Sequence, residues 1–68
     1  MQNIPERLKQ LRVQMGLTQT EMATKLGMVQ QAWQKLETGK VPDMRASTII
    51  LICSTLDISA DWLLGLTE

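Results

Sequence analysis

The most informative pattern in the chain lies in residues 18–39, which read TQTEMATKLGMVQQAWQKLETG. Thr18 and Glu21 match a capping box, in which both side chains bond to backbone N–H groups left free at the start of a helix. The apolar face of the predicted helix is formed by Met22, Ala23 and Leu26. Gly27 then allows the positive φ that a sharp turn needs. A short helix followed by a tight turn is therefore predicted.

A second short helix is predicted at about Gln30–Glu37, with Trp33 and Leu36 turned inward and Gly39 as its end. The two-helix unit spans about residues 19–38, and its turn of three or four residues is typical of two helices that cross at a steep angle. Ala23 is expected where the crossing helix approaches most closely. The remaining faces of the second helix carry Gln30, Gln31, Gln34 and Lys35, which form a candidate recognition surface.

Three further helices complete an all-α expectation of five short helices. The first begins near Pro5, which suits a first helical turn, and ends before Gly16. Its apolar positions are Leu8, Leu11 and Met15. After a loop at 41–43, a helix at about Met44–Leu56 contains the run IILIC at 49–53, which is apolar nearly all round and predicts a central buried helix. Ser59 is expected to cap a short fifth helix that carries Trp62, Leu63 and Leu66.

The composition restricts the class of protein. The 68 residues amount to one domain, 1–68. No apolar run reaches membrane-spanning length, and no basic-then-apolar signal peptide opens the chain. The single cysteine, Cys53, cannot form an internal disulfide, which fits a reducing cytoplasm. The absence of histidine excludes a His-based triad or zinc site. We also expect no cofactor, metal or small-molecule ligand.

The charges are unevenly distributed although the formal net charge is zero. Residues 1–45 hold all seven basic residues and four acidic ones, a net charge of +3, whereas 46–68 hold three acidic residues and no basic one. The first two-thirds of the chain could therefore face phosphate groups. With counts this small, ordinary charge scatter is the competing explanation.

Four segments together resemble a known family: 18–27, the pair Gln30-Gln31, the segment LETGK at 36–40, and the ending DWLL at 61–64. They are similar to the Cro/repressor-type (XRE-like) helix-turn-helix family, in particular to the phage 434 Cro and repressor domains. The resemblance implies a five-helix, lambda-repressor-like fold, a homodimer on a near-palindromic operator of double-stranded DNA, and transcriptional repression in the cytoplasm, at the nucleoid.

The resemblance also implies roles for individual residues. Gln30 and Gln31 match glutamines that contact base edges, and Gln19 matches one that contacts phosphate and buttresses the base-reading glutamine. The positions that match phosphate contacts are Thr18, Thr38 and Lys40. Independently, a glutamine amide offers both a donor and an acceptor, so it can bind adenine bidentately.

Four further residues stand out in the comparison with the family. Arg12 and Glu37 match an ion pair that links the first helix to the end of the third. Val29 stands where a capping or phosphate-binding side chain often precedes the recognition helix. Trp33 replaces a smaller Ile or Val, and its bulk could tilt the helix until Gln34 or Lys35 faces the bases.

Two other functions remain open at this point. An antitoxin that regulates its own expression uses the same fold, but 68 residues leave little room for a toxin-binding surface. A protein-interaction module with weakened DNA contacts is favoured mildly by the zero net charge and by Val29. An enzyme has almost no support, because the carboxylates are scattered and the only thiol lies in an apolar run. The segment 59–66, with the loop near Pro42, is expected to form the dimer contact.

Overall fold

The computed structural model describes residues 4–41 and 44–66. Within these ranges the chain forms five α-helices and no strand. Their bounds are α1 Ile4–Gln14, α2 Gln19–Leu26, α3 Gln30–Thr38, α4 Ala46–Leu56 and α5 Ala60–Leu63. The predicted all-α class and the five helices are confirmed. None of the helices in these ranges is long and apolar enough to cross a membrane.

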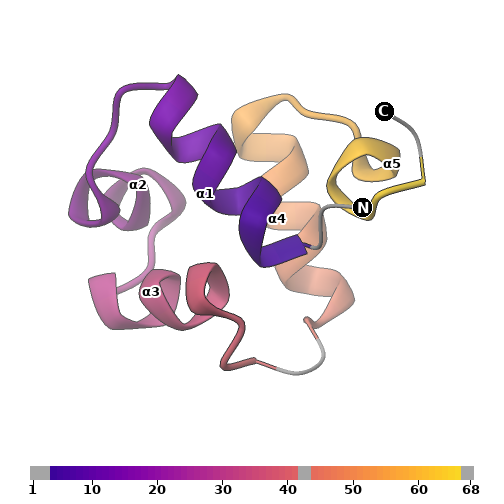
Figure 1. The fold of residues 1–68 in the computed structure, drawn as a ribbon. Helices are drawn as coiled ribbons and strands as arrows, with labels where there is room; N and C mark the ends of the chain where they lie inside the picture. Colours follow the sequence, from indigo (N-terminus) through magenta and orange to yellow (C-terminus); the bar gives the residue numbers. More distant parts are fainter. Residues whose placement is uncertain (1–3, 42–43, 67–68) are drawn as a thin grey trace.

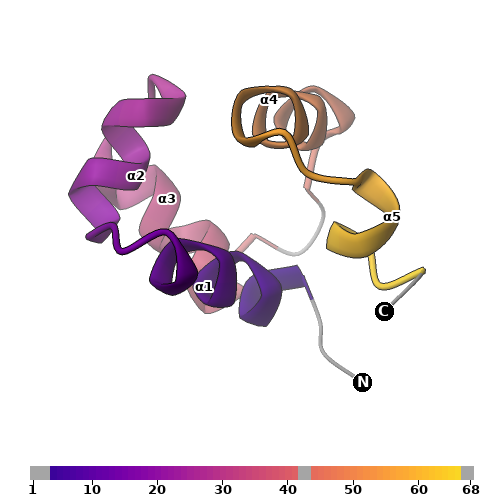
Figure 2. The ribbon, with the colours of Figure 1, turned by 90° about the horizontal axis from the view of Figure 1, so that it is seen from above.

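The helices pack around one another with α1 in the centre of the view (Figure 1). α1 contacts α3 and α5, α2 contacts α3, and α4 contacts α2 and α5. Figure 2, seen from above, shows α2 and α3 together on one side of the molecule and α4 and α5 on the other. α3 is therefore packed against α1 and α2.

The core is made of eight side chains contributed by all five helices: Leu8, Met22, Ala23, Leu26, Trp33, Leu36, Ile52 and Leu63. The predicted inner faces of α2 and α3 are confirmed, since each of their apolar residues in this set is buried. Ala23 is 1% exposed within this core, so a larger side chain there would have to displace its neighbours. Trp33 is fully buried and is one of the largest side chains of the core.

The prediction that 49–53 forms a central buried helix is wrong. The segment is helical, but only Ile52 is fully buried, while Ile50 is 63% and Leu51 40% exposed. The physical reason is position: α4 lies at the side of the molecule, and its main helical contacts, with α2 and α5, leave part of its surface uncovered. An apolar surface therefore remains on the outer face of α4.

Two smaller expectations also fail. α1 ends at Gln14, so Met15 lies in the turn that follows and is 38% exposed instead of packing beneath the helix. α5 is a single turn, and Leu66 lies beyond it with 70% of its surface exposed. The predicted cap of α5 is confirmed, because the Ser59 hydroxyl accepts a hydrogen bond from the Trp62 backbone N–H.

Candidate nucleic-acid interface

The turn between α2 and α3 sets the direction of α3. Gly27 has φ of 72°, the left-handed conformation that favours glycine, and the next backbone N–H, from Met28, donates to the carbonyl of Ala23 over 2.9 Å. On the other side of the turn, Val29 is the N-cap of α3 and provides no side-chain hydrogen bond. The missing cap inferred from the sequence is confirmed, and Val29 is 70% exposed.

α3 has one buried face and one exposed face. Trp33, Leu36 and Glu37 are buried, and the exposed residues are Gln31, Gln34, Lys35 and Thr38. The first residue, Gln30, is half-buried beside α2. The candidate recognition surface predicted from the sequence is therefore assembled on α3, with polar side chains that point away from the core.

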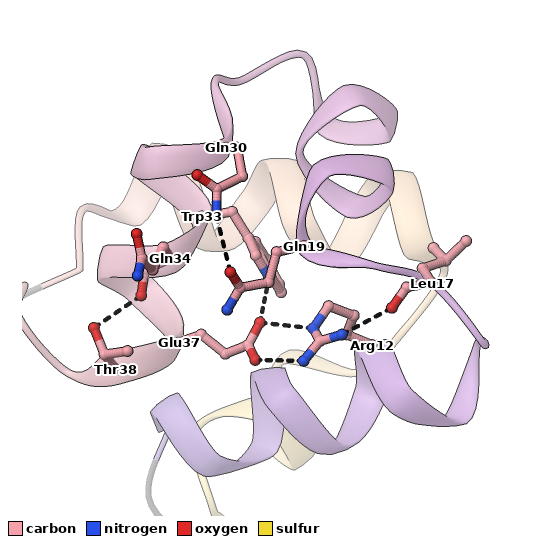
Figure 3. A network of polar contacts seen from close by, with 8 residues as sticks. All are labelled: Arg12, Leu17, Gln19, Gln30, Trp33, Gln34, Glu37 and Thr38. Atoms are coloured by element: carbon pink, nitrogen blue, oxygen red, sulfur yellow. Dashed lines mark hydrogen bonds and ion pairs between the residues drawn. The ribbon is translucent and has the colours of Figure 1, made fainter.

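Gln30 is held by a glutamine from the neighbouring helix. Its side-chain nitrogen Nε2 donates to Oε1 of Gln19 over 2.9 Å, as Figure 3 shows. Gln19 is the first residue of α2 and is itself half-buried. The added bulk of Trp33 does not separate the two glutamines. The hydrogen bond restricts the motion of the Gln30 side chain and leaves its oxygen and second N–H for another partner.

Behind these glutamines lies a partly buried ion pair. Nε and NH2 of Arg12 donate to Oε2 and Oε1 of Glu37, each over 2.9 Å, and NH1 of Arg12 donates to the carbonyl of Leu17 (Figure 3). The side chain of Glu37 is only 3% exposed. The pair implied by the family resemblance is present and ties α1 to the end of α3.

Trp33 adds a hydrogen bond that the sequence analysis missed. Its indole N–H donates to Oε2 of Glu37 from four positions earlier on the same helix. This spacing places two side chains on one helical face, so the pair could have been inferred from the sequence. The Glu37 carboxylate therefore receives donors from both α1 and α3.

These donors control the ionisation of Glu37. Burial alone would raise the pKa of its carboxyl group, but the hydrogen bonds from Arg12 and Trp33, the positive charge of Arg12 and a contact from Gln19 together hold the pKa below its ordinary value. Glu37 is consequently a carboxylate at neutral pH. An ionised carboxylate accepts hydrogen bonds and donates none.

The two threonines matched to phosphate contacts both use their hydroxyl groups within the protein. Thr18 caps α2, and its oxygen accepts from the Glu21 backbone N–H over 3.1 Å. Hydrogen bonds from the backbone and the side chain of Thr18 lower the pKa of the Glu21 carboxyl group. The Thr38 hydroxyl instead donates its proton to the carbonyl of Gln34 over 2.8 Å. Thr38 must give up that bond before it can donate to a phosphate oxygen.

The basic residues divide into exposed and packed ones. Lys35 and Lys40 are exposed at the end of α3, and Arg45 is exposed as the N-cap of α4. Arg7 is only 7% exposed, with its guanidinium carbon 5.0 Å from the centre of the Trp62 ring. Arg7 and Arg12 are thus part of the packing, so the positive surface is smaller than the sequence suggests. No sequence signal indicated the burial of Arg7.

A groove of about 390 Å³ lies beside the candidate recognition surface. Gln31 and Lys35 of α3 form one side of it, and Arg45 and Thr48 at the start of α4 lie on the other. Thr48 was not singled out from the sequence. The groove brings the start of α4 next to the exposed face of α3, so both elements can approach the same extended ligand.

The chain belongs to a helix-turn-helix domain family, whose model matches residues 6–63. This match confirms the predicted Cro/repressor-type helix-turn-helix domain.

Two curated relatives from Bacillus subtilis (strain 168) are similar over 60 residues, which are 87% of this chain. The uncharacterized HTH-type transcriptional regulator YqaE is 45% identical, and the aligned part is 50% of its length. The SPbeta prophage-derived uncharacterized HTH-type transcriptional regulator YonR is 40% identical, with 54% of its length aligned. The chain therefore spans about half the length of these relatives.

Proposed function

We propose that the protein is a transcriptional repressor of phage or prophage type that binds double-stranded operator DNA, with α3 in the major groove. The observation that carries the proposal is the pair Gln30–Gln31 at the start of α3, where Gln31 is exposed and the half-buried Gln30 is already held by Gln19. A helix presented in this way enters the major groove with its N-terminal residues first. The names of the two relatives, both regulators and one prophage-derived, support it.

The contacts divide into two kinds under this proposal. Gln30 and Gln31 read base edges through their amide groups, because an amide can pair with N6 and N7 of adenine. Thr18, Lys35 and Lys40 contact phosphates, which fix the register on the duplex and carry no sequence information. Repression follows from occupancy, since a bound protein blocks access to the same stretch of DNA, and no catalytic step is involved.

A homodimer on the DNA is the second part of the proposal. Leu64 is 40% and Leu66 70% exposed just after α5, which leaves apolar surface that a partner could cover. The other expected contact, the loop near Pro42, lies outside the described residues. A small interface would hold the dimer firmly only on the operator.

The test begins with selection of binding sites from random duplex DNA, followed by fluorescence anisotropy and ultracentrifugation on the enriched site. We expect binding at least about 10³-fold tighter than to a scrambled duplex, within the usual range for specific binding. At saturation, two protomers should occupy each site. Failure to enrich any sequence would contradict the repressor proposal, and a single protomer per site would contradict the dimer.

A further inference from the structure

The polar network behind α3 contains one group that can only accept hydrogen bonds. The Glu37 carboxylate receives two donors from Arg12 and one from the Trp33 indole, in a setting where its side chain is 3% exposed. With little water nearby, an unfavourable contact between two acceptors is costly. Any neutral amide that faces this carboxylate must therefore turn its nitrogen toward it.

Gln19 is such an amide, and it lies between Glu37 and Gln30. Figure 3 shows its side-chain nitrogen turned toward the Glu37 carboxylate and its oxygen toward Gln30. That oxygen accepts the 2.9 Å hydrogen bond from Nε2 of Gln30. The Gln19 amide is also one of the groups that lower the pKa of Glu37. The three groups therefore follow one order: the Gln30 nitrogen donates to the Gln19 oxygen, and the Gln19 nitrogen faces the Glu37 carboxylate.

We propose that Glu37 is a positioning residue for base recognition, which fixes the orientation of the Gln30 amide through Gln19 without touching DNA. The carboxylate requires the nitrogen of Gln19, so the oxygen of Gln19 is left for Gln30. Gln30 must then turn its nitrogen to Gln19, and its oxygen and second N–H remain for a base. This inference rests on the proposed function, because it gives Gln30 a base to read.

Trp33 and Arg12 hold the Glu37 carboxylate in place. Their donors bind the Glu37 carboxylate from α3 and α1, so neither its orientation nor its charge changes when the protein approaches DNA. The order of donor and acceptor on Gln30 is therefore set in the free protein. Adenine presents its acceptor N7 and its donor N6 in a fixed order, so an amide of one orientation matches it and the flipped amide does not.

The first test uses the free wild-type protein and needs no DNA. Scalar couplings through hydrogen bonds, measured by NMR on ¹⁵N,¹³C-labelled protein, report which nitrogen donates to which carbonyl. We expect a coupling from Nε2 of Gln30 to Cδ of Gln19. A coupling in the opposite direction, or none in either direction, would overturn the proposal. Because this readout is independent of DNA, it separates the proposal from the repressor function.

The second test uses Glu37→Gln, whose amide can face Gln19 with either its oxygen or its nitrogen. The matched control is Glu6→Gln, which removes the same charge from an exposed position on α1. A bidentate contact discriminates between bases by about 5- to 150-fold, and Glu37→Gln should lose most of this factor at the base that Gln30 reads. The flipped Gln30 amide presents its nitrogen where N6 of adenine would donate, so it can donate to O4 of thymine or O6 of guanine instead, and affinity for the mismatched base rises. If half of the Gln30 amides keep the productive orientation, affinity for the preferred duplex falls only about twofold per half-site.

The loss of discrimination with nearly unchanged affinity is the pattern that distinguishes positioning from general damage. Folded Glu37→Gln protein that discriminates as well as Glu6→Gln would overturn the proposal. If Glu37→Gln does not fold, a wild-type coupling that is reversed or absent still overturns the proposal, because the proposal requires Nε2 of Gln30 to donate to Gln19. If the wild-type protein selects no DNA sequence, the repressor proposal fails, while the coupling, measured in the wild type and in folded Glu37→Gln, still tests whether Glu37 sets the orientation of Gln30.

Discussion

The side-chain nitrogen of Gln30 donates a hydrogen bond to the side-chain oxygen of Gln19 over 2.9 Å, across 11 positions of sequence. The bond joins the first residue of α3 to the first residue of α2. A side chain ordered before binding loses less conformational entropy when it binds. Because the bond to Gln19 orders the Gln30 side chain before binding, removing the bond should weaken DNA affinity by a measurable amount.

Gln19→Ala should weaken operator binding even though it leaves Gln30 in place. The released Gln30 side chain must be ordered on binding, which costs about 0.5–1.5 kcal/mol per half-site. Fluorescence anisotropy with the selected duplex measures this loss. The control is Thr20→Ala, since Thr20 is the exposed neighbour on α2. Equal affinities of the two variants would show that the Gln19–Gln30 bond does not assist binding.

Val29→Thr should stabilise the protein. Val29 has the extended backbone of an N-cap, with φ −77° and ψ 154°, but no side-chain hydrogen bond to the free N–H groups of α3. A threonine hydroxyl can supply that bond, so the free energy of unfolding should rise by about 0.5–2 kcal/mol. Urea denaturation measures it. The converse change at the cap of α2, Thr18→Val, should lower the free energy of unfolding by a similar amount. A Val29→Thr protein that is no more stable than the wild type would contradict this account of the turn.

Glu37 should make stability depend on acid pH. Its folded pKa is lower than its ordinary value of 4.5, so folding favours the ionised form. The resulting stabilisation is present above about pH 4.5, near the unfolded pKa, and is lost as the pH falls through the folded pKa. Thermal melts from pH 7 to pH 3 should show a steeper loss for the wild type than for Glu37→Gln. Parallel curves for the two proteins would exclude Glu37 as a source of the pH dependence.

Lys40→Ala should weaken binding to all DNA sequences alike. Lys40 is exposed just after α3, where a phosphate contact contributes affinity and no base discrimination. Each neutralised phosphate contributes about −0.9 to the slope of log affinity against log salt, and we expect a slope of about −5 to −8 for the wild-type dimer. The variant should flatten it by about 2, one contact in each half-site, whereas Lys9→Ala on α1 should not. A wild-type slope near zero would favour a protein-interaction module instead.

The parts of the fold set by local chemistry could be predicted from the sequence. The capping box of Thr18 and Glu21 and the left-handed turn at Gly27 depend on neighbouring residues alone, and both are present in the structure. The inward positions of Trp33 and Leu36 follow from helical periodicity, and they too are confirmed. The start and end of the two-helix unit could therefore be predicted from the sequence.

The features that depend on distant packing could not be predicted in the same way. The exposure of Ile50 and Leu51 reflects how many helices cover α4, which the apolar run itself does not reveal. Arg7 becomes buried because α5 brings Trp62 against it. At the candidate site, only the family resemblance related Arg12 to Glu37, which lie 25 positions apart. That Gln30 and Gln31 read bases stays a prediction.

The central claim is that the glutamines at the start of α3 read the DNA sequence. The most direct measurement is selection of preferred sites from random duplex DNA by the wild type, Gln30→Ala and Gln31→Ala, with thermal melts in parallel. Gln31 is exposed, so Gln31→Ala should keep its stability within about 0.5 kcal/mol. Gln30→Ala removes the half-buried bond to Gln19, so it should cost about 0.5–1.5 kcal/mol and still fold. Each should lose about 1–3 kcal/mol of preference at the base it contacts, while non-specific affinity hardly changes. If both folded variants select the same sequence as the wild type, the glutamines do not read the operator.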